Sequence, residues 1–299
     1  MKTNIYFDSS WEPLDIRYDS VFKAVFTRDT PKSIGALSDL ISSFIGRKLT
    51  VATITANEQP IDDTRDRCIR YDISCKSESG ELVNIEMSLN PDVHEPVRLE
   101  YYACKLFSRQ DIRSIARNYS DLKESYQITL LANRRIFDDD ALVHKFRYHD
   151  SDHNVSLGGR SQIITVELRK AELVIDKPVK AMEASEAWAS FFQYLTDREK
   201  REKINMIVQN EGGIAMASEV LIEITQEDRE WARQLSEEKF ILDKQSRDVT
   251  AWREGHKEGL QEGRRENQLE VARNLKANGA SIELITNSTG LTPEEIARF

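Results

Sequence analysis

Two carboxylate side chains stand at matched positions of a predicted β-hairpin, and they offer the clearest chemistry in the sequence. The runs RCIRYDISCKS and ELVNIEMSL alternate polar and apolar residues with a period of two, which is typical of antiparallel strands. If the turn between them centres on Ser79, Asp72 lies directly opposite Glu86 and both side chains point to the same face. Like charges that face each other in this way destabilise a hairpin.

A divalent cation would offset the repulsion within this pair. Mg²⁺ binds carboxylate oxygens and keeps some of its water ligands, and such a metal can generate hydroxide and stabilise the transition state of phosphoryl transfer. The basic residues Arg70 and Lys76 of the same face offer another source of compensation, and an exposed sheet face of mixed charge would carry the same pattern. Glu58 and Asp19 are further acidic candidates, Glu58 as a metal ligand at the end of the preceding strand and Asp19 at the start of a helix.

The elements that would position the pair alternate between helix and strand. Helical periodicity covers YDSVFKAVF and PKSIGALSDLISSFIG near the N-terminus, and a long helix is predicted over residues 95–118. Strands are predicted over residues 50–56, 126–133 and 161–168, in addition to the hairpin. This order predicts a compact α/β or α+β domain that ends near residue 170.

The composition changes after this domain, because residues 185–299 contain no convincing strand pattern. We therefore predict two domains, residues 1–175 and an all-helical region of residues 176–299. Gly255, Gly259 and Gly263 recur every four residues, which indicates a close helix contact or a weak helix that becomes ordered on a partner. We expect these amphipathic helices to mediate homo-oligomerisation.

The last segment, SIELITNSTGLTPEEIARF, is typical of a small helix-turn-helix unit. Thr292 is placed to cap the second helix and Pro293 fits its first turn. A unit of this kind can enter a DNA groove. Because Arg298 is its only basic residue, we favour a packing or interaction role over DNA binding.

Bulk properties narrow the class of protein further. The chain has 299 residues, 39% of them hydrophobic and 31% charged, with a net charge of −9. It can bury a sizeable core, but its acidity means that any nucleic-acid contact needs a local basic surface or a bound metal. Cys68, Cys75 and Cys104 have no CxxC spacing, which argues against a disulfide framework or a zinc site. With no signal-peptide core and no membrane-length apolar run, we expect a soluble cytoplasmic protein.

The order of helix, strand with Asp72, turn, strand with Glu86 and helix resembles the PD-(D/E)XK nuclease superfamily. The segments YDSVFKAVF, RYDI, GELVNIEMS, PVRLEYYACKLF and ITNSTGLTPEEIARF are similar to its recombination-promoting nuclease group, also described as transposase-like proteins. The similarity covers roughly residues 18–170 and the helical tail. It implies a restriction-endonuclease-like αβββαβ core and a DNA endonuclease dependent on Mg²⁺ or Mn²⁺ that promotes recombination. Asp72 corresponds to the motif aspartate and Glu86 to the motif glutamate.

One position departs from that pattern. The third motif residue is Lys in the superfamily and usually Gln in this group, but here it is Ser88, which cannot polarise the attacking water as lysine does. Arg98, Tyr102 and Lys105 share one face of the following helix, so Arg98 or Lys105 could bring a compensating cation to the strands as a catalytic residue. Lys23 of the first helix is another candidate for this compensating cation. Alternatively, Arg98, Tyr102 and Lys105 only pack at the solvated edge of the sheet.

Three hypotheses of function therefore stand side by side. The presence of both Asp72 and Glu86 favours an active metal-dependent DNA nuclease. Ser88 and the acidic net charge favour a catalytically impaired relative that binds nucleic acid or protein. A helical assembly module dominated by the C-terminal region is the third.

Overall fold

The computed structural model describes residues 6–8, 12–55, 72–110, 118–224, 259 and 263–298. The chain divides into two compact units, residues 1–236 and 237–299. Within the described ranges, no helix combines the length and the apolar character needed to cross a membrane.

The first unit is built around a six-stranded mixed sheet with the order β1-β2-β3-β4-β8-β5. Strands β1, β2 and β3 form an antiparallel meander, β3, β4 and β8 run parallel, and β5 closes the edge antiparallel to β8. The strands are β1 (Val51–Thr55), β2 (Ile73–Ser77), β3 (Leu82–Ser88), β4 (Ser125–Leu131), β5 (Val143–Phe146) and β8 (Ser161–Glu167), and a separate small hairpin joins β6 (His149–Asp150) and β7 (Val155–Ser156).

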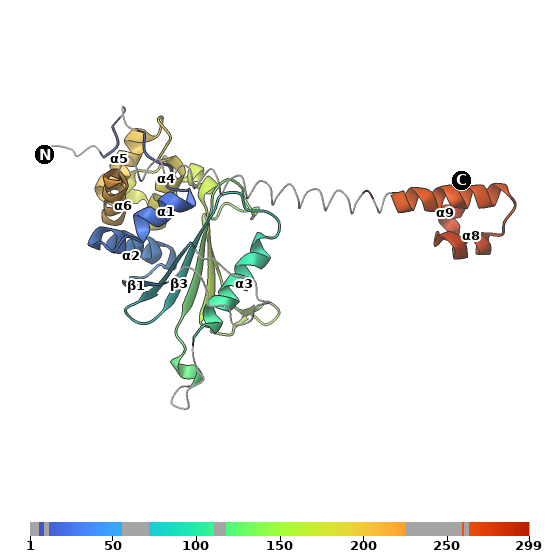
Figure 1. Ribbon diagram of the computed structural model, residues 1–299, viewed down its shortest axis with the longest axis horizontal. Coiled ribbons are helices and arrows are strands. Elements are labelled where there is room, and N and C mark those ends of the chain that lie inside the picture. Colours follow the sequence, from blue (N-terminus) through green and yellow to red (C-terminus); the bar gives the residue numbers. More distant parts are fainter. Residues whose placement is uncertain are drawn as a thin grey trace. The chain divides into compact units, whose positions relative to one another are not determined.

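One face of this sheet carries the hydrophobic core. Val83 and Ile85 of β3 are fully buried there, in one core cluster with aromatic side chains such as Phe22 and Trp188. Figure 1 shows the helices α1, α2, α4, α5 and α6 gathered on this side of the sheet. They are α1 (Asp19–Phe26), α2 (Pro31–Ile45), α4 (Ala184–Tyr194), α5 (Arg201–Asn210) and α6 (Gly212–Glu223), and the short 3-10 helices η2 (Leu168–Leu173) and η3 (Val179–Ala181) precede α4.

Helix α2 shows how local sequence sets these elements. Thr30 accepts a hydrogen bond from the backbone N–H of Ser33, and Pro31 occupies the first turn, where its missing N–H costs nothing. Gly46 ends the helix with a φ of 85°, a left-handed conformation that favours glycine. Residues at its two ends therefore specify where α2 begins and where it ends.

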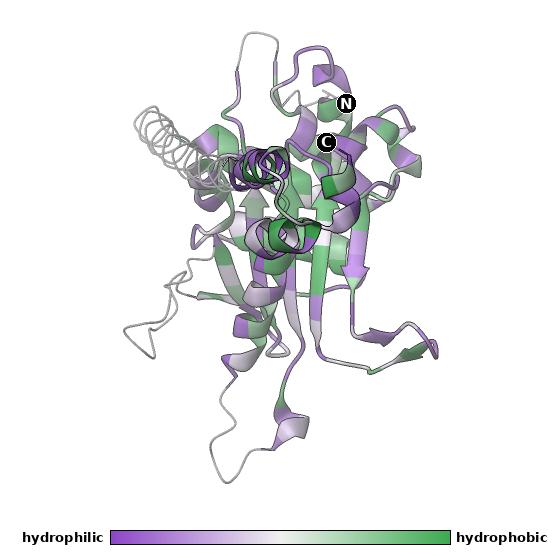
Figure 2. Ribbon diagram, turned by 90° about the vertical axis from the view of Figure 1, so that its right-hand side faces the viewer, coloured by the Kyte–Doolittle hydropathy of each residue, from purple (hydrophilic) through white to green (hydrophobic). Residues whose placement is uncertain are grey.

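The other face of the sheet is polar and lies under helix α3 (Glu95–Ser108) on the opposite side from α1 and α2 (Figure 1). Leu99, Ala103 and Leu106 form the buried side of α3. Beneath the helix, polar side chains of three neighbouring strands are buried, among them Asn84, Glu86, Gln127, Thr129 and Thr165. In Figure 2, hydrophilic and hydrophobic residues are interspersed along the strands of the sheet, as expected for a sheet with one polar and one apolar face.

Most of the predicted elements of the first unit are confirmed, including the α/β class and the restriction-endonuclease-like core. The strands predicted over residues 50–56, 126–133 and 161–168 are β1, β4 and β8, whereas the helix predicted over 95–118 ends at Ser108. Strands β5, β6 and β7 were not predicted, because they are short and largely exposed and so lack a clear alternating pattern. Helices α4, α5 and α6 lie within the first compact unit, whereas the sequence places a boundary near residue 175.

The second unit has a small core of its own. Residues 263–277 are helical and precede α8 (Ile282–Thr289) and α9 (Pro293–Ala297). Thr292 accepts a hydrogen bond from the backbone N–H of Glu295, as predicted for a capping residue, and Gly290 ends α8 with a φ of 73°. A Cβ atom added at Gly259 or Gly263 would meet no described atom within 4 Å, and Gly255 lies outside the described residues. Ala272, Ile285, Leu291 and Ile296 form the core of this unit.

Candidate functional site

The hairpin brings Asp72 and Glu86 together. Ile73 pairs with Ile85 and Ser74 with Asn84, so one further step along the same register places Asp72 opposite Glu86. The backbone N–H of Asp72 donates to Oε1 of Glu86 over 3.3 Å, and the N–H of Met87 donates to Oδ2 of Asp72 over 2.9 Å. Each residue is only 6% exposed. The two carboxylates thus lie side by side, largely shielded from solvent, at the end of β3.

Burial and repulsion act together on Glu86. They raise the pKa of its carboxyl to about 8, with burial the larger cause and the Asp72 charge the second. Hydrogen bonding from Asn84 and the positive charge of Arg98 oppose this shift without cancelling it. At neutral pH and without a bound cation, Glu86 therefore retains a proton that it would lose at the surface.

A buried amide chain orients the Glu86 carboxyl. The Asn84 side-chain amide donates to Oε1 of Glu86 over 3.2 Å and to Oε1 of Gln127 over 2.7 Å, and the Gln127 amide donates to Thr129 over 3.2 Å. Neither Asn84 nor Gln127 was selected from the sequence as a site residue. The signal was present, because Gln127 and Thr129 alternate with the apolar residues of their strand. Their depth beneath α3 was not visible in the sequence.

Ser88 lies two residues beyond Glu86 on the same face, and Arg98 reaches it from α3. The guanidinium Nη2 of Arg98 is 3.4 Å from Oγ of Ser88 and 2.6 Å from Oε1 of Glu95. Glu95 is buried, with 5% of its surface exposed, and it fixes the guanidinium at the start of the helix. Its attraction raises the pKa of Arg98, although burial opposes the charge. Arg98 thus lies beside Ser88, and Glu95, which holds it there, was not selected from the sequence.

A second cation approaches the pair from α1. The ammonium of Lys23 is 3.6 Å from Oδ1 of Asp72, and it is 2.8 Å from Oδ1 of Asp19 one turn earlier on the helix. Both were candidates in the sequence, Lys23 as a compensating cation and Asp19 as a further acidic residue, but no spacing there fixed their distance from the hairpin. Helix α1, which packs against α2 and α6, brings Lys23 to one side of Asp72, while Arg98 lies on the side of Ser88.

The other candidates lie further from this arrangement or outside the described residues. Lys105 lies roughly 10 Å further along α3 than Arg98, and its ammonium is 5.8 Å from the centroid of the Tyr101 ring. Glu58 and Arg70 lie outside the described residues.

A separate group of acidic and histidine side chains lies near the end of β8 and was not selected from the sequence. Asp139, His144 and Glu167 have ligand atoms that lie close enough together to hold a metal ion. The fully buried ammonium of Lys170, however, contacts Glu167 and lies 2.9 Å from Asp139. The N–H of Ile136 donates to Glu167 as well. The ammonium of Lys170 already lies between the two carboxylates, so we interpret this group as a structural network that holds the segment after β4 in place.

The hairpin pair suits a divalent cation better. Its ligands would be carboxylate oxygens, which Mg²⁺ and Mn²⁺ prefer, and both burial and the neighbouring Asp72 charge raise the pKa of Glu86, two penalties that a bound cation would reduce. Oε2 of Glu86 accepts no hydrogen bond from the described residues, and Oδ1 of Asp72 faces Lys23. The residues present therefore fit a metal held by Asp72 and Glu86, next to two cations that could face a phosphate.

Comparison with known proteins agrees with this geometry. The family model described as PD-(D/E)XK nuclease family transposase matches residues 16–251, which includes the hairpin, α1 and α3. Neither the curated proteins nor the solved structures give a significant match. The match spans most of the chain and supports a nuclease-type function. The chain belongs to the PD-(D/E)XK nuclease family of transposases.

Proposed function

We propose that this protein is a DNA endonuclease that depends on Mg²⁺ or Mn²⁺ and hydrolyses phosphodiester bonds at the Asp72–Glu86 pair. The observation that carries the proposal is the buried carboxylate pair itself, in which the Asp72 charge helps to raise the pKa of Glu86 to about 8. A cation bound there would activate water and stabilise charge on the scissile phosphate. The role in recombination that the family resemblance implies, and the cytoplasmic location expected from the sequence, are part of the same proposal.

Different residues of the chain would hold that cation, orient its ligands and stabilise charge on the phosphate. Asp72 and Glu86 supply the ligands, and the chain Asn84–Gln127 holds Glu86 in place. Arg98, held by Glu95 beside Ser88, is positioned to stabilise negative charge on the phosphate oxygens. A preorganised donor of this kind contributes several kcal/mol at other enzyme sites. Arg98 thereby takes over part of the role of the lysine that Ser88 replaces.

Calorimetry with Mg²⁺ or Mn²⁺ tests the metal site, and plasmid cleavage tests the reaction. Wild type should bind the cation and cleave, whereas Asp72→Ala should lose both. Glu78→Ala is the matched control, because Glu78 is an exposed acidic residue in the turn of the same hairpin. Equal cation binding by wild type and Asp72→Ala would remove the pair from the site.

Ser88 supports a second candidate function, that of a catalytically impaired relative that binds nucleic acid. Serine has neither the charge nor the reach of lysine, so the variant Ser88→Lys separates the two. If wild type cleaves and Arg98→Ala does not, although it still binds metal, the arginine compensates for the serine. If neither wild type nor Ser88→Lys cleaves plasmid with either metal, the binding function takes precedence.

A further inference from the structure

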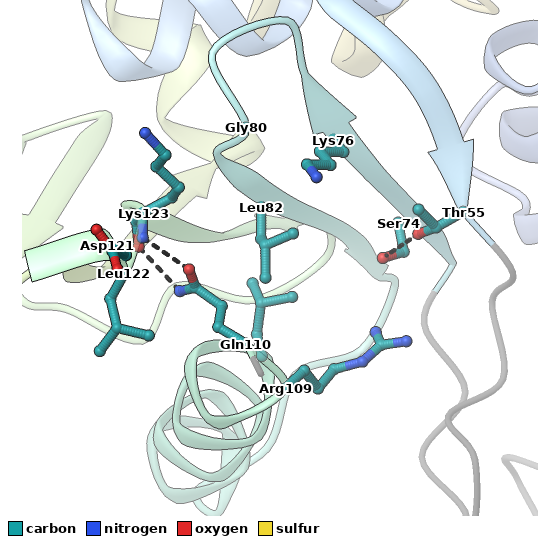
Figure 3. Close-up of a pocket in the computed structure, with 11 residues that line it drawn as sticks. Thr55, Ser74, Lys76, Gly80, Leu82, Arg109, Gln110, Asp121, Leu122 and Lys123 are labelled. Atoms are coloured by element: carbon teal, nitrogen blue, oxygen red, sulfur yellow. Dashed lines mark hydrogen bonds between the residues drawn. The ribbon is translucent and has the colours of Figure 1, made fainter. Parts of the chain in front are cut away.

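A polar groove of about 440 Å³ opens on the same sheet face as the proposed metal site. Ser74 and Lys76 of β2 line it on one side, and Arg109 and Gln110, just beyond the end of α3, line it on the other (Figure 3). Ser74 and Lys76 follow Asp72 at alternate positions, so all three side chains point to one face. The groove therefore continues the surface of the hairpin that bears the carboxylate pair.

Two lysines converge at this groove. A Cβ atom added at Gly80 would lie 3.7 Å from Cε of Lys76 and 3.6 Å from Cε of Lys123. In Figure 3 the two side chains flank Gly80 on either side. Neither ammonium forms an ion pair with a carboxylate in the ranges that the structure describes, and both residues are exposed. Two positive charges on either side of Gly80, without a carboxylate counter-ion among the described residues, favour the approach of an anion to this end of the groove.

Among the described residues that line the groove, Asp121 is the acidic one, and its carboxylate is held by a local hydrogen bond. The Asp121 carboxylate accepts a hydrogen bond from the N–H of Asn118 over 2.9 Å, within the short 3-10 helix η1 (Tyr119–Asp121). Gln110 fixes the position of Lys123 through two hydrogen bonds to its backbone, at 2.7 and 2.9 Å. Lys123 thus stands at a set distance from α3, and its side chain remains available to a ligand.

The remaining walls are apolar and the space is narrow. Leu82, Leu106 and Leu122 line the groove between these polar groups. A volume of this size is that of a pocket for a small molecule, in the range of about 300–1,000 Å³, and a nucleic-acid duplex cannot enter it. One nucleotide of a single strand fits this chemistry, with its base against the leucines and its phosphate at the lysines.

We propose that this groove binds a single nucleic-acid strand, with one phosphate between Lys76 and Lys123. Lys76 lies roughly 13 Å along the extended strand from Asp72, a distance that a nucleic-acid strand spans in a few nucleotides. This proposal rests on the proposed function, because the phosphate bound by the two lysines would then lie within a few nucleotides of the scissile phosphate. The substrate is then engaged as a separated strand at the end of the hairpin.

Fluorescence anisotropy with a labelled single-stranded DNA oligonucleotide, in EDTA and over a range of salt concentrations, tests the groove. Lys76→Ala and Lys123→Ala should each weaken binding about tenfold and lower the slope of log K against log salt by about 0.7, the share of one phosphate contact in a single strand. Lys76→Arg should restore most of the affinity. Leu122→Ala should weaken binding several-fold without a change in slope, because it removes an apolar contact only. Lys180→Ala, an exposed lysine on η3, should bind as wild type.

Three outcomes would contradict the proposal that the groove binds a single strand. The first is no binding by wild type, and the second is wild-type affinity in the Lys76→Ala/Lys123→Ala double variant. The third is an equal loss of affinity, in the lysine variants, for a blunt duplex of the same sequence. The same measurement is made with a single-stranded RNA oligonucleotide, and an equal loss of affinity in the lysine variants would support recognition of the phosphate rather than of the sugar. The outcome is separable from that of the proposed function. If Asp72→Ala leaves plasmid cleavage unchanged while the lysine variants lose strand binding, the metal site is wrong and the groove stands.

Discussion

Glu86→Gln should stabilise the metal-free protein, although it removes a residue that we place at the reaction centre. Glutamine has the same shape and can still accept the hydrogen bonds that Asp72 N–H and Asn84 donate to Oε1. It carries no charge, so it avoids the burial cost and the repulsion from Asp72 that raise the pKa of Glu86 to about 8. The gain in stability therefore appears only where the unfolded glutamate would be ionised.

The size of the effect follows from the two pKa values. Between the ordinary value of 4.5 and the raised value of about 8, the native state holds a proton that the unfolded chain releases. The stability of wild type consequently falls as the pH rises through this window. One pKa unit corresponds to about 1.4 kcal/mol, so the difference from Glu86→Gln should grow from near zero at pH 4.5 to at most about 3 kcal/mol at pH 7. It should level off above pH 8.

Urea denaturation in EDTA at pH 4.5, 7 and 8.5 measures this difference. Glu81→Gln is the matched control, because Glu81 is equally buried at the other end of the hairpin but is paired with Arg47. Burial there is outweighed by hydrogen bonds from Ser79 and Arg47, so the pKa of Glu81 is lowered. Glu81→Gln should destabilise the protein at pH 7, and the loss should fade as the pH falls below 4.5. A constant difference for Glu86→Gln at all three pH values, or a loss of stability at pH 7, would refute the reasoning.

Three further outcomes are expected. Arg98→Ala should abolish plasmid cleavage while calorimetry still shows cation binding, since the arginine is not a ligand; full cleavage by this variant would contradict its role. Gly213→Ala should lower the free energy of unfolding by about 1–3 kcal/mol, because the added methyl group would overlap the Asp39 side chain. Gly212→Ala, with open space around it, should be neutral or slightly stabilising. Truncation after residue 236, at the boundary between the two units, should convert an oligomer into a monomer, as measured by light scattering. A full-length chain that is monomeric at micromolar concentration would show that the C-terminal region does not mediate self-association.

The sequence by itself determined the parts that depend on local rules. A strict period of two on both sides of a short turn set the hairpin register, and with it the opposition of Asp72 and Glu86. Capping residues fixed the ends of α2 and the start of α9 in the same way, through Thr30, Gly46 and Thr292. These signals involve neighbours in the chain, so they need no knowledge of the fold.

Only the tertiary structure decided which distant side chains meet the pair. Lys23, Arg98 and Gln127 reach it from α1, α3 and β4, and no spacing in the sequence records how those elements pack. The burial that raises the pKa of Glu86 is likewise a property of the layer beneath α3. The convergence of Lys76 and Lys123 at Gly80 arises because β4 runs parallel to β3, which brings the start of β4 to the hairpin turn. Contacts of this kind depend on how whole elements pack, and periodicity along the chain carries no information about them.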